Sequence, residues 1–202
     1  MNKIKYLNLF WVILCVALAT INPLDMHDYL LHQAGTLIMI GILLYYNRFI
    51  QISNLSFSLY CFGFLTLHIF AAHWLYSSVP YNEWLIQLFN FDLDKTFGWQ
   101  RNMFDRVVHF GYGLLVYPFF YQVFAHYFKT LSKKQLAFIV LMWVMASSML
   151  YELIEWALAM SLSPEQAEAY NGQQGDMWDA HKDMLIATIG AIMMACFYPK
   201  KH

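Results

Sequence analysis

Six apolar stretches, separated by short polar segments, dominate the residue pattern of this chain. They cover approximately residues 6–22, 33–50, 56–77, 106–128, 136–160 and 183–199. A helix needs about 20 apolar residues to cross the roughly 30 Å hydrocarbon core of a bilayer. We therefore predict an all-α polytopic membrane protein, in which residues 1–202 form one domain, a six-transmembrane-helix bundle.

The first stretch is short, and two interpretations of it are open. Lys3 and Lys5 precede it and Ala17-Leu18-Ala19 lie near its end, a pattern that also resembles a secretory signal peptide. We expect a retained first helix, because the rest of the chain has the pattern of a protein that crosses the membrane several times. Cleavage would remove one helix and leave the other five stretches unchanged.

Basic residues fall mainly on one side of the membrane when the loops are assigned alternately to its two sides. This side contains Lys3, Lys5, Arg48, Lys129, Lys133, Lys134, Lys200 and Lys201. The opposite loops are acidic, and their basic residues are chiefly Lys95 and Arg101. The positive-inside rule then places both termini in the cytoplasm of a bacterial inner membrane, with the acidic loops in the periplasm.

The composition agrees with this assignment and excludes other classes. Hydrophobic residues make up 60% of the chain and charged residues 12%, whereas a soluble domain has about 25% charged residues. The net charge of −1 gives no reason to expect a nucleic-acid partner. The expected partner is the lipid bilayer, and the oligomeric state stays open.

The polar residues inside or beside the apolar stretches gather at the predicted external face. They come from three segments, residues 105–109, 152–155 and 176–183. Ionisable groups at membrane depth are costly, so several that converge from separate helices predict a functional site. The three segments provide five candidate metal ligands, which are Asp105, His109, Glu152, Asp179 and Asp183.

The chemistry of this set favours a divalent metal ion. Carboxylates held close together repel one another, and a cation relieves the repulsion. One or two histidines with two or three carboxylates suit zinc, manganese or iron. Asp105 would orient His109 or serve as a fifth ligand.

A metal ion in this place would favour hydrolysis of a lipid or a lipid-linked envelope molecule, because it activates bound water. Glu155 is the candidate general base. Arg106 or Arg101 could hold an anionic head group through paired hydrogen bonds.

Two alternatives stay open. Arg101, Arg106 and Lys182 could neutralise three acids in a structural ion-pair network, in which Arg106 would pair with an acid on another helix. The acids could instead belong to a transporter or a proton pathway. The sequence has neither an inverted repeat nor a pair of broken helices, which often accompany secondary transporters.

Further residues have expected roles that are mainly structural. His27 and His32 flank the start of the second stretch, where interfacial histidines are common. Trp156 and Trp178 could wall the polar pocket. Small residues would allow close helix contacts around it, and these are Gly111, Gly113, Ala187, Gly190 and Ala191.

We also predict the local structure of three segments outside these motifs. His68 and His73 lie about 140° apart on a helical wheel, so their two side chains do not readily point to the same site. Residues 81–91 have the pattern of a helix that lies in the membrane interface. A short helix is expected within residues 163–175, with Ser163 as its N-cap.

Three blocks of the sequence, RNMFDRVVHFGYG, YELIEW and GDMWDAHKDM, resemble the YjdF-like family of bacterial inner-membrane proteins. The resemblance covers almost the whole chain. His68, His73 and Tyr76, followed by Pro80, also match the pattern of this family. The resemblance implies an inner-membrane protein whose polar residues act together.

A looser similarity links the chain to VanZ-like proteins, which are associated with glycopeptide resistance and the cell envelope. It rests only on Asp105, His109, Glu152 and Asp183. Neither resemblance implies an established reaction.

Overall fold

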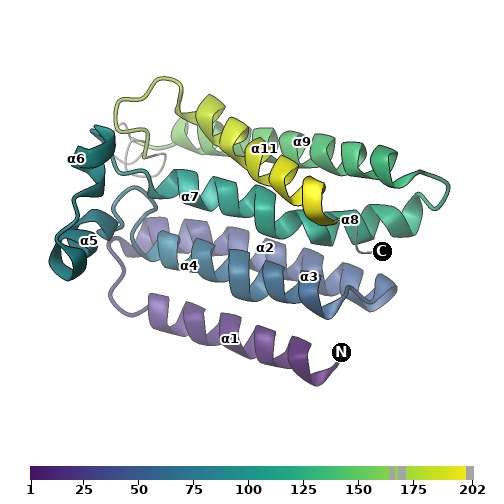
Figure 1. The fold of residues 1–202 in the computed structure, drawn as a ribbon. Helices are drawn as coiled ribbons and strands as arrows, with labels where there is room; N and C mark the ends of the chain where they lie inside the picture. Colours follow the sequence, from purple (N-terminus) through teal and green to yellow (C-terminus); the bar gives the residue numbers. More distant parts are fainter. Residues whose placement is uncertain (164–166, 168–171, 199–202) are drawn as a thin grey trace.

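The computed structural model describes residues 1–163, 167 and 172–198, which form a bundle of long helices (Figure 1). In chain order the elements are α1 (Lys3–Ala19), α2 (Met26–Ile50), α3 (Asn54–Ser58), the π-helix η1 (Leu59–Leu65), α4 (Thr66–His73), α5 (Tyr81–Phe89), α6 (Leu93–Phe97), α7 (Phe104–Gly111), the π-helix η2 (Tyr112–Val116), α8 (Tyr117–Tyr127), α9 (Lys133–Ala159) and α11 (Asp179–Phe197). The described part of the chain contains no strand, which confirms the predicted all-α class.

Five stretches of helix are long and apolar enough to cross a membrane. They are Met26–Ile50, Asn54–His73, Phe104–Tyr127, Lys133–Ala159 and Asp179–Phe197, and they correspond to the last five predicted stretches. α1 has 17 residues, a length of about 25 Å. Because this length is below the thickness of the bilayer core, a sixth span stays a prediction for α1.

Polar side chains connect α1 to the rest of the bundle. Lys5 Nζ donates a hydrogen bond to Asn47 Oδ1 at 2.6 Å, and Trp11 Nε1 donates to Thr66 Oγ1 at 2.9 Å. α1 begins at the same end of the bundle at which α11 ends (Figure 1). α1 is therefore part of the packed bundle, and its retention in the mature protein stays a prediction.

Glycines allow α11 to lie directly against the helix formed by α7 and η2. A Cβ atom at Gly113 would overlap the carbonyl oxygen of Ala187, and one at Gly190 would overlap the carbonyl oxygen of Phe110. The predicted role of small residues in close helix contacts is confirmed at these two positions. The contact also fixes the position of Asp183, one turn before Ala187.

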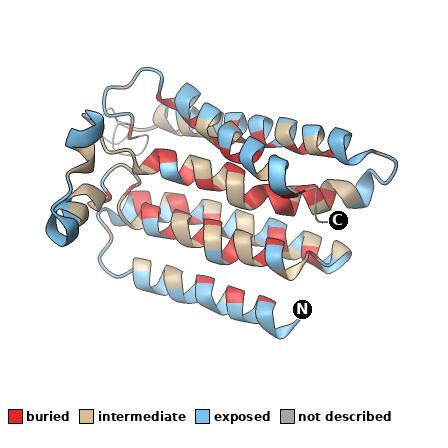
Figure 2. Cartoon of the chain, viewed as in Figure 1, coloured by how far each residue is buried: buried red, intermediate tan, exposed pale blue. Residues whose placement is uncertain are grey.

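Buried residues lie mainly in the middle of the bundle, and the outward faces of α1 and α9 are largely exposed (Figure 2). Many of these exposed side chains are apolar, such as Leu150 on α9 and Leu185 on α11. An apolar exposed face is typical of helices that contact lipid.

The connection between α4 and α7 extends beyond the end of the bundle, where it forms α5 and α6 (Figure 1). α5 confirms the helix predicted over residues 81–91, and it exposes Leu88 and Phe89. Burial raises the pKa of Tyr81 to about 12, so its hydroxyl stays protonated and can donate to Asp94 Oδ1 at 2.8 Å. Insertion of α5 into the membrane interface stays a prediction. The helix expected within residues 163–175 lies largely outside the described residues.

Candidate functional site

The predicted site residues gather at the end of the bundle that also carries α5 and α6. α7 and α11 begin at this end, and α9 ends there. Glu152 lies seven residues before the last residue of α9, a depth of about 11 Å along the helix. The two segments that start α7 and α11 therefore meet the end of α9, as the sequence pattern predicts.

Local hydrogen bonds from side chains form just before the first residues of α7 and α11, the two helices that carry the aspartates. Asn102 Oδ1 accepts a hydrogen bond from Phe104 N at 3.0 Å, and Asn102 Nδ2 donates to the carbonyl oxygen of Val79 at 2.8 Å. Asp176 Oδ1 accepts from Trp178 N at 3.1 Å, which is an Asx turn. The Asp176 side chain holds the backbone in this turn, and α11 begins three residues later, at Asp179.

Two arginines bind most of the aspartates. We call this group the arginine cluster, and its members are Arg101, Arg106, Asp105, Asp176 and Asp179. Arg101 pairs with Asp105 and Asp179, and Arg106 Nη2 donates to Asp179 Oδ1 at 2.5 Å. Both guanidinium groups are largely buried, with 11% and 8% of the Arg101 and Arg106 side chains exposed. The prediction that Arg106 pairs with an acid on another helix is confirmed.

Asp176 occupies the outer rim of this cluster. Lys182 Nζ donates to Asp176 Oδ2 at 2.7 Å, and Arg106 Nη2 lies 3.4 Å from the same oxygen. The hydrogen bond from Lys182 lowers the pKa of Asp176 below its ordinary value of 3.8. The carboxylate is therefore ionised at neutral pH and contributes one of the negative charges that balance the two arginines.

Three further side chains face one another without such cations between them. We call His109, Glu152 and Asp183 the ligand trio. His109 Nδ1 lies 3.8 Å from Glu152 Oε1, and His109 Nε2 lies 3.8 Å from Asp183 Oδ1. Both distances are too long for a hydrogen bond. One ligand atom from each member lies within 4.8 Å of those of the other two.

Two carboxylate oxygens of the ligand trio are buried and have no hydrogen-bond partner among the described residues. They are Glu152 Oε1 and Asp183 Oδ1. Asp183 uses its other oxygen, Oδ2, in an ion pair with Arg106 Nη1. Only 9% of the Glu152 side chain and 5% of the Asp183 side chain are exposed. Buried carboxylate oxygens are normally paired, so these two are suited to a cation.

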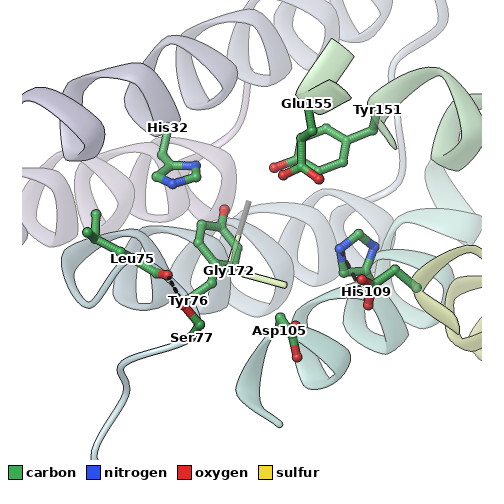
Figure 3. Close-up of a pocket in the computed structure, with 10 residues that line it drawn as sticks. His32, Leu75, Tyr76, Ser77, Asp105, His109, Tyr151, Glu155 and Gly172 are labelled. Carbon is green, nitrogen blue, oxygen red and sulfur yellow. Dashed lines mark hydrogen bonds and ion pairs between the residues drawn. The ribbon is translucent and has the colours of Figure 1, made fainter. Parts of the chain in front are cut away.

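A small cavity adjoins the ligand trio (Figure 3). It is lined by His32, Leu75, Tyr76, Ser77, Asp105, His109, Tyr151, Glu155, Gly172 and Asp183. Its volume is about 20 Å³, which is enough for about one water molecule. Glu155, the predicted general base, thus lies at the same cavity as two members of the trio.

The sequence pattern did not indicate Tyr76 as a cavity residue. Leu75 and Tyr76 have φ values of +50° and +58°, in the left-handed region that non-glycine residues rarely adopt. This turn directs Tyr76 back toward the bundle, where its hydroxyl binds His68 Nδ1. Strained turns of this kind cluster at functional sites. Two consecutive left-handed residues without glycine leave no recognisable sequence signal.

His32 also differs from its expected place. Its ring is buried, lies 4.7 Å from the ring of Tyr76 and lines the cavity. His32 therefore lies within α2 and faces the interior of the bundle, and its expected, mainly structural role stays a prediction.

Other expected placements are partly confirmed. His68 binds Tyr76, whereas His73 Nδ1 donates a hydrogen bond to the carbonyl oxygen of Ala19 at 2.8 Å. The two histidine side chains therefore point to different places, as predicted. Trp156 and Trp178 are 62% and 55% exposed and do not line the cavity. The suggestion that they wall the pocket is wrong.

Comparisons with known proteins extend over the whole bundle. The family described as "Predicted membrane protein (DUF2238)" matches residues 4–201. The inner membrane protein YjdF of Escherichia coli strain K12 is 27% identical over 182 residues, which cover 90% of this chain and 82% of that protein. No solved structure matches the chain. The matched region includes every segment of the arginine cluster and the ligand trio.

Proposed function

The chain belongs to the DUF2238 family of predicted membrane proteins. From the geometry of the ligand trio, we propose that it binds a divalent metal ion, and from its similarity to an inner membrane protein, that it does so in the inner membrane. The proposed ligands are His109, Glu152 and Asp183. The proposed reaction is hydrolysis of a lipid or lipid-linked envelope molecule at the periplasmic face, with both chain termini in the cytoplasm.

The observation that carries this proposal is the pair of buried oxygens without a partner, Glu152 Oε1 and Asp183 Oδ1, on either side of His109. An uncompensated buried carboxylate is strongly unfavourable. A divalent cation removes this cost for both carboxylates at once. One imidazole and two carboxylates fit zinc, manganese or iron.

The arginine cluster supports the ligand trio by fixing its geometry. Arg106 holds Asp183 Oδ2, so Asp183 Oδ1 stays directed to His109. Asp105 and Asp179 were also expected to bind the metal, but one oxygen of each is engaged by an arginine, Asp105 Oδ2 by Arg101 and Asp179 Oδ1 by both Arg101 and Arg106. We therefore propose that these two aspartates position the arginines. The earlier expectation that Arg106 holds a substrate head group stays a prediction.

When bound, the metal would lower the pKa of a coordinated water and polarise a phosphoryl or carbonyl group. Glu155 lines the adjoining cavity and is the proposed acceptor of the proton from the attacking water. The small volume of the cavity, which Leu75, Tyr76 and Gly172 help to line, limits the number of competing water molecules.

Metal analysis of the detergent-purified protein by inductively coupled plasma mass spectrometry tests the site. The decisive comparison is Asp183→Asn with Asp179→Asn, because both residues are buried on α11 one turn apart. We expect about one metal ion per wild-type chain, loss of the metal in Asp183→Asn and Glu152→Gln, and retention in Asp179→Asn.

Two results would contradict the proposal. If the wild-type protein holds no metal even after reloading, the polar residues form an ion-pair core or an ion pathway, and flux measurements in liposomes distinguish these. If Asp179→Asn loses the metal as completely as Asp183→Asn, the division between the two groups is wrong.

The reaction is tested separately from the metal. Purified protein is incubated with a labelled envelope lipid extract, and hydrolysis products are measured beside Glu155→Gln. We expect this variant to keep its metal and to lose activity by a factor of about 10² or more, the usual contribution of a general base. Metal-loaded wild-type protein that releases no product from any lipid fraction would contradict the hydrolase assignment.

A further inference from the structure

An apolar groove lies between α9 and α11, on the same two helices that carry Glu152 and Asp183. Its volume is about 330 Å³, and it is lined by Met145, Ala146, Met149, Met184, Leu185 and Thr188. The Thr188 hydroxyl donates to the carbonyl oxygen of Met184 at 2.7 Å, so it offers no unpaired polar group to the groove. The walls are therefore apolar along both helices.

One end of the groove lies at about the same level along α9 and α11 as the ligand trio, whose side chains do not line it. Met149 lies three residues before Glu152, which makes the two side chains neighbours on α9. On α11 Met184 directly follows Asp183, and Thr188 lies one turn farther along. From the trio, both walls run toward the middle of their helices.

This placement corresponds to the depth of one lipid leaflet. The ligand trio lies near the end of the spans, and the far end of the groove lies near the centres of α9 (Lys133–Ala159) and α11 (Asp179–Phe197). A lipid whose head group reaches the trio has acyl chains that extend over the same range of depth. Because the helices cross the membrane, the groove opens to hydrocarbon.

We propose that the groove binds an acyl chain of the lipid on which the protein acts, with the head group at the ligand trio. This inference rests on the proposed function and narrows its substrate to an acyl lipid that enters sideways from the outer leaflet. Flexible methionine side chains, three of which line the groove, adapt to chains of different length and unsaturation.

The test uses the full-length protein in nanodiscs of phosphatidylethanolamine that contain a small fraction of a phospholipid with a diazirine in its acyl chain. After photolysis, labelled peptides are mapped by mass spectrometry. We expect labels to concentrate on the groove residues of α9 and α11. An even distribution over all lipid-facing helices would show ordinary boundary lipid and would overturn the proposal.

Neighbouring positions on α9 provide a matched pair of variants. Met149→Trp fills the groove, whereas Leu150→Trp adds the same side chain at an exposed position outside it (the two residues are 49% and 57% exposed). We expect Met149→Trp to lower groove labelling about tenfold, equivalent to the loss of about two buried methylenes, and Leu150→Trp to leave it unchanged. Equal effects of the two variants would contradict the proposal.

Folding and metal content are measured on the same samples. If Met149→Trp is not monodisperse, Met145→Phe replaces it as a smaller filling of the groove. Metal analysis keeps the two proposals apart. Groove labelling without bound metal would refute the metal site and leave an acyl-chain site, whereas bound metal with even labelling would refute the groove alone.

Discussion

Asp179 and Asp183 lie one turn apart on α11 and are almost equally buried, at 6% and 4% exposed, yet their surroundings differ. Asp179 belongs to the arginine cluster, where one of its oxygens binds both guanidinium groups. Asp183 Oδ2 forms an ion pair with Arg106. Asp183 Oδ1 faces His109 and has no hydrogen-bond partner among the described residues.

This difference separates two uses of charge inside a membrane protein. In the arginine cluster, charges of both signs are present, and the ion pairs stabilise the start of α7 against the start of α11. In the ligand trio, two carboxylates meet one histidine, and the oxygens that face this histidine, Glu152 Oε1 and Asp183 Oδ1, have no hydrogen-bond partner among the described residues. A compensated cluster fixes geometry, whereas an uncompensated cluster is suited to bind a ligand of opposite charge.

Removal of Arg106, the cation that pairs with both Asp179 and Asp183, has the largest expected effect. Arg106→Met leaves Asp179 and Asp183 buried without their nearest cation, so the free energy of unfolding should fall by about 3–5 kcal/mol. The measurement is equilibrium unfolding in mixed detergent micelles, followed by circular dichroism.

The control for Arg106 is Lys182→Met, since the Lys182 side chain is 53% exposed. An exposed ion pair contributes at most about 1 kcal/mol. If the two variants lower the free energy of unfolding equally, Arg106 does not compensate the buried aspartates as described.

Neutralisation of Glu152 tests the ligand trio in the same way. In metal-free protein, Glu152→Gln should raise the free energy of unfolding by about 1 kcal/mol, because the wild type must either bury an uncompensated charge beside Asp183 or take up a proton on Glu152. With metal at about 100 times its dissociation constant, the wild type should gain about 2.7 kcal/mol that the variant lacks. The order of stability therefore reverses when chelator is replaced by metal. The same order under both conditions would contradict a ligand role for Glu152.

Asp176 gives the smallest expected effect, at the solvent-exposed rim of the arginine cluster. Its pKa is lowered in the folded protein by Lys182, so its contribution to stability is present above the ordinary aspartate pKa. The contribution is lost as the pH falls through the lowered folded-state value. We therefore measure the thermal midpoint of unfolding at neutral pH and at about pH 3. The difference between the two midpoints should be smaller in Asp176→Asn than in the wild type. Parallel curves for wild type and variant would contradict this role.

The sequence predicted most of the fold and the location of the site. Apolar length alone located five spans, and the polar segments 105–109, 152–155 and 176–183 located the end of the bundle that carries the site. These features depend on local periodicity, which a single sequence contains.

The pairing of charges could not be predicted in the same way. Whether Arg101 and Arg106 or a metal ion compensates a given aspartate depends on rotamers and on the close approach of α11 at Gly113 and Gly190. The contribution of Tyr76 depends on a left-handed turn without glycine, which no propensity predicts. Contacts between distant segments therefore decide the details of the site.

X-ray absorption at the metal edge of zinc-loaded protein identifies the metal ligands. We expect a first shell of one imidazole nitrogen at about 2.0–2.1 Å with carboxylate or water oxygens at about 2.0–2.2 Å, and this shell should be unchanged in Asp179→Asn. Sulfur ligands, two or more imidazoles, or a shell altered by Asp179→Asn would contradict the assignment of His109, Glu152 and Asp183 as the metal ligands.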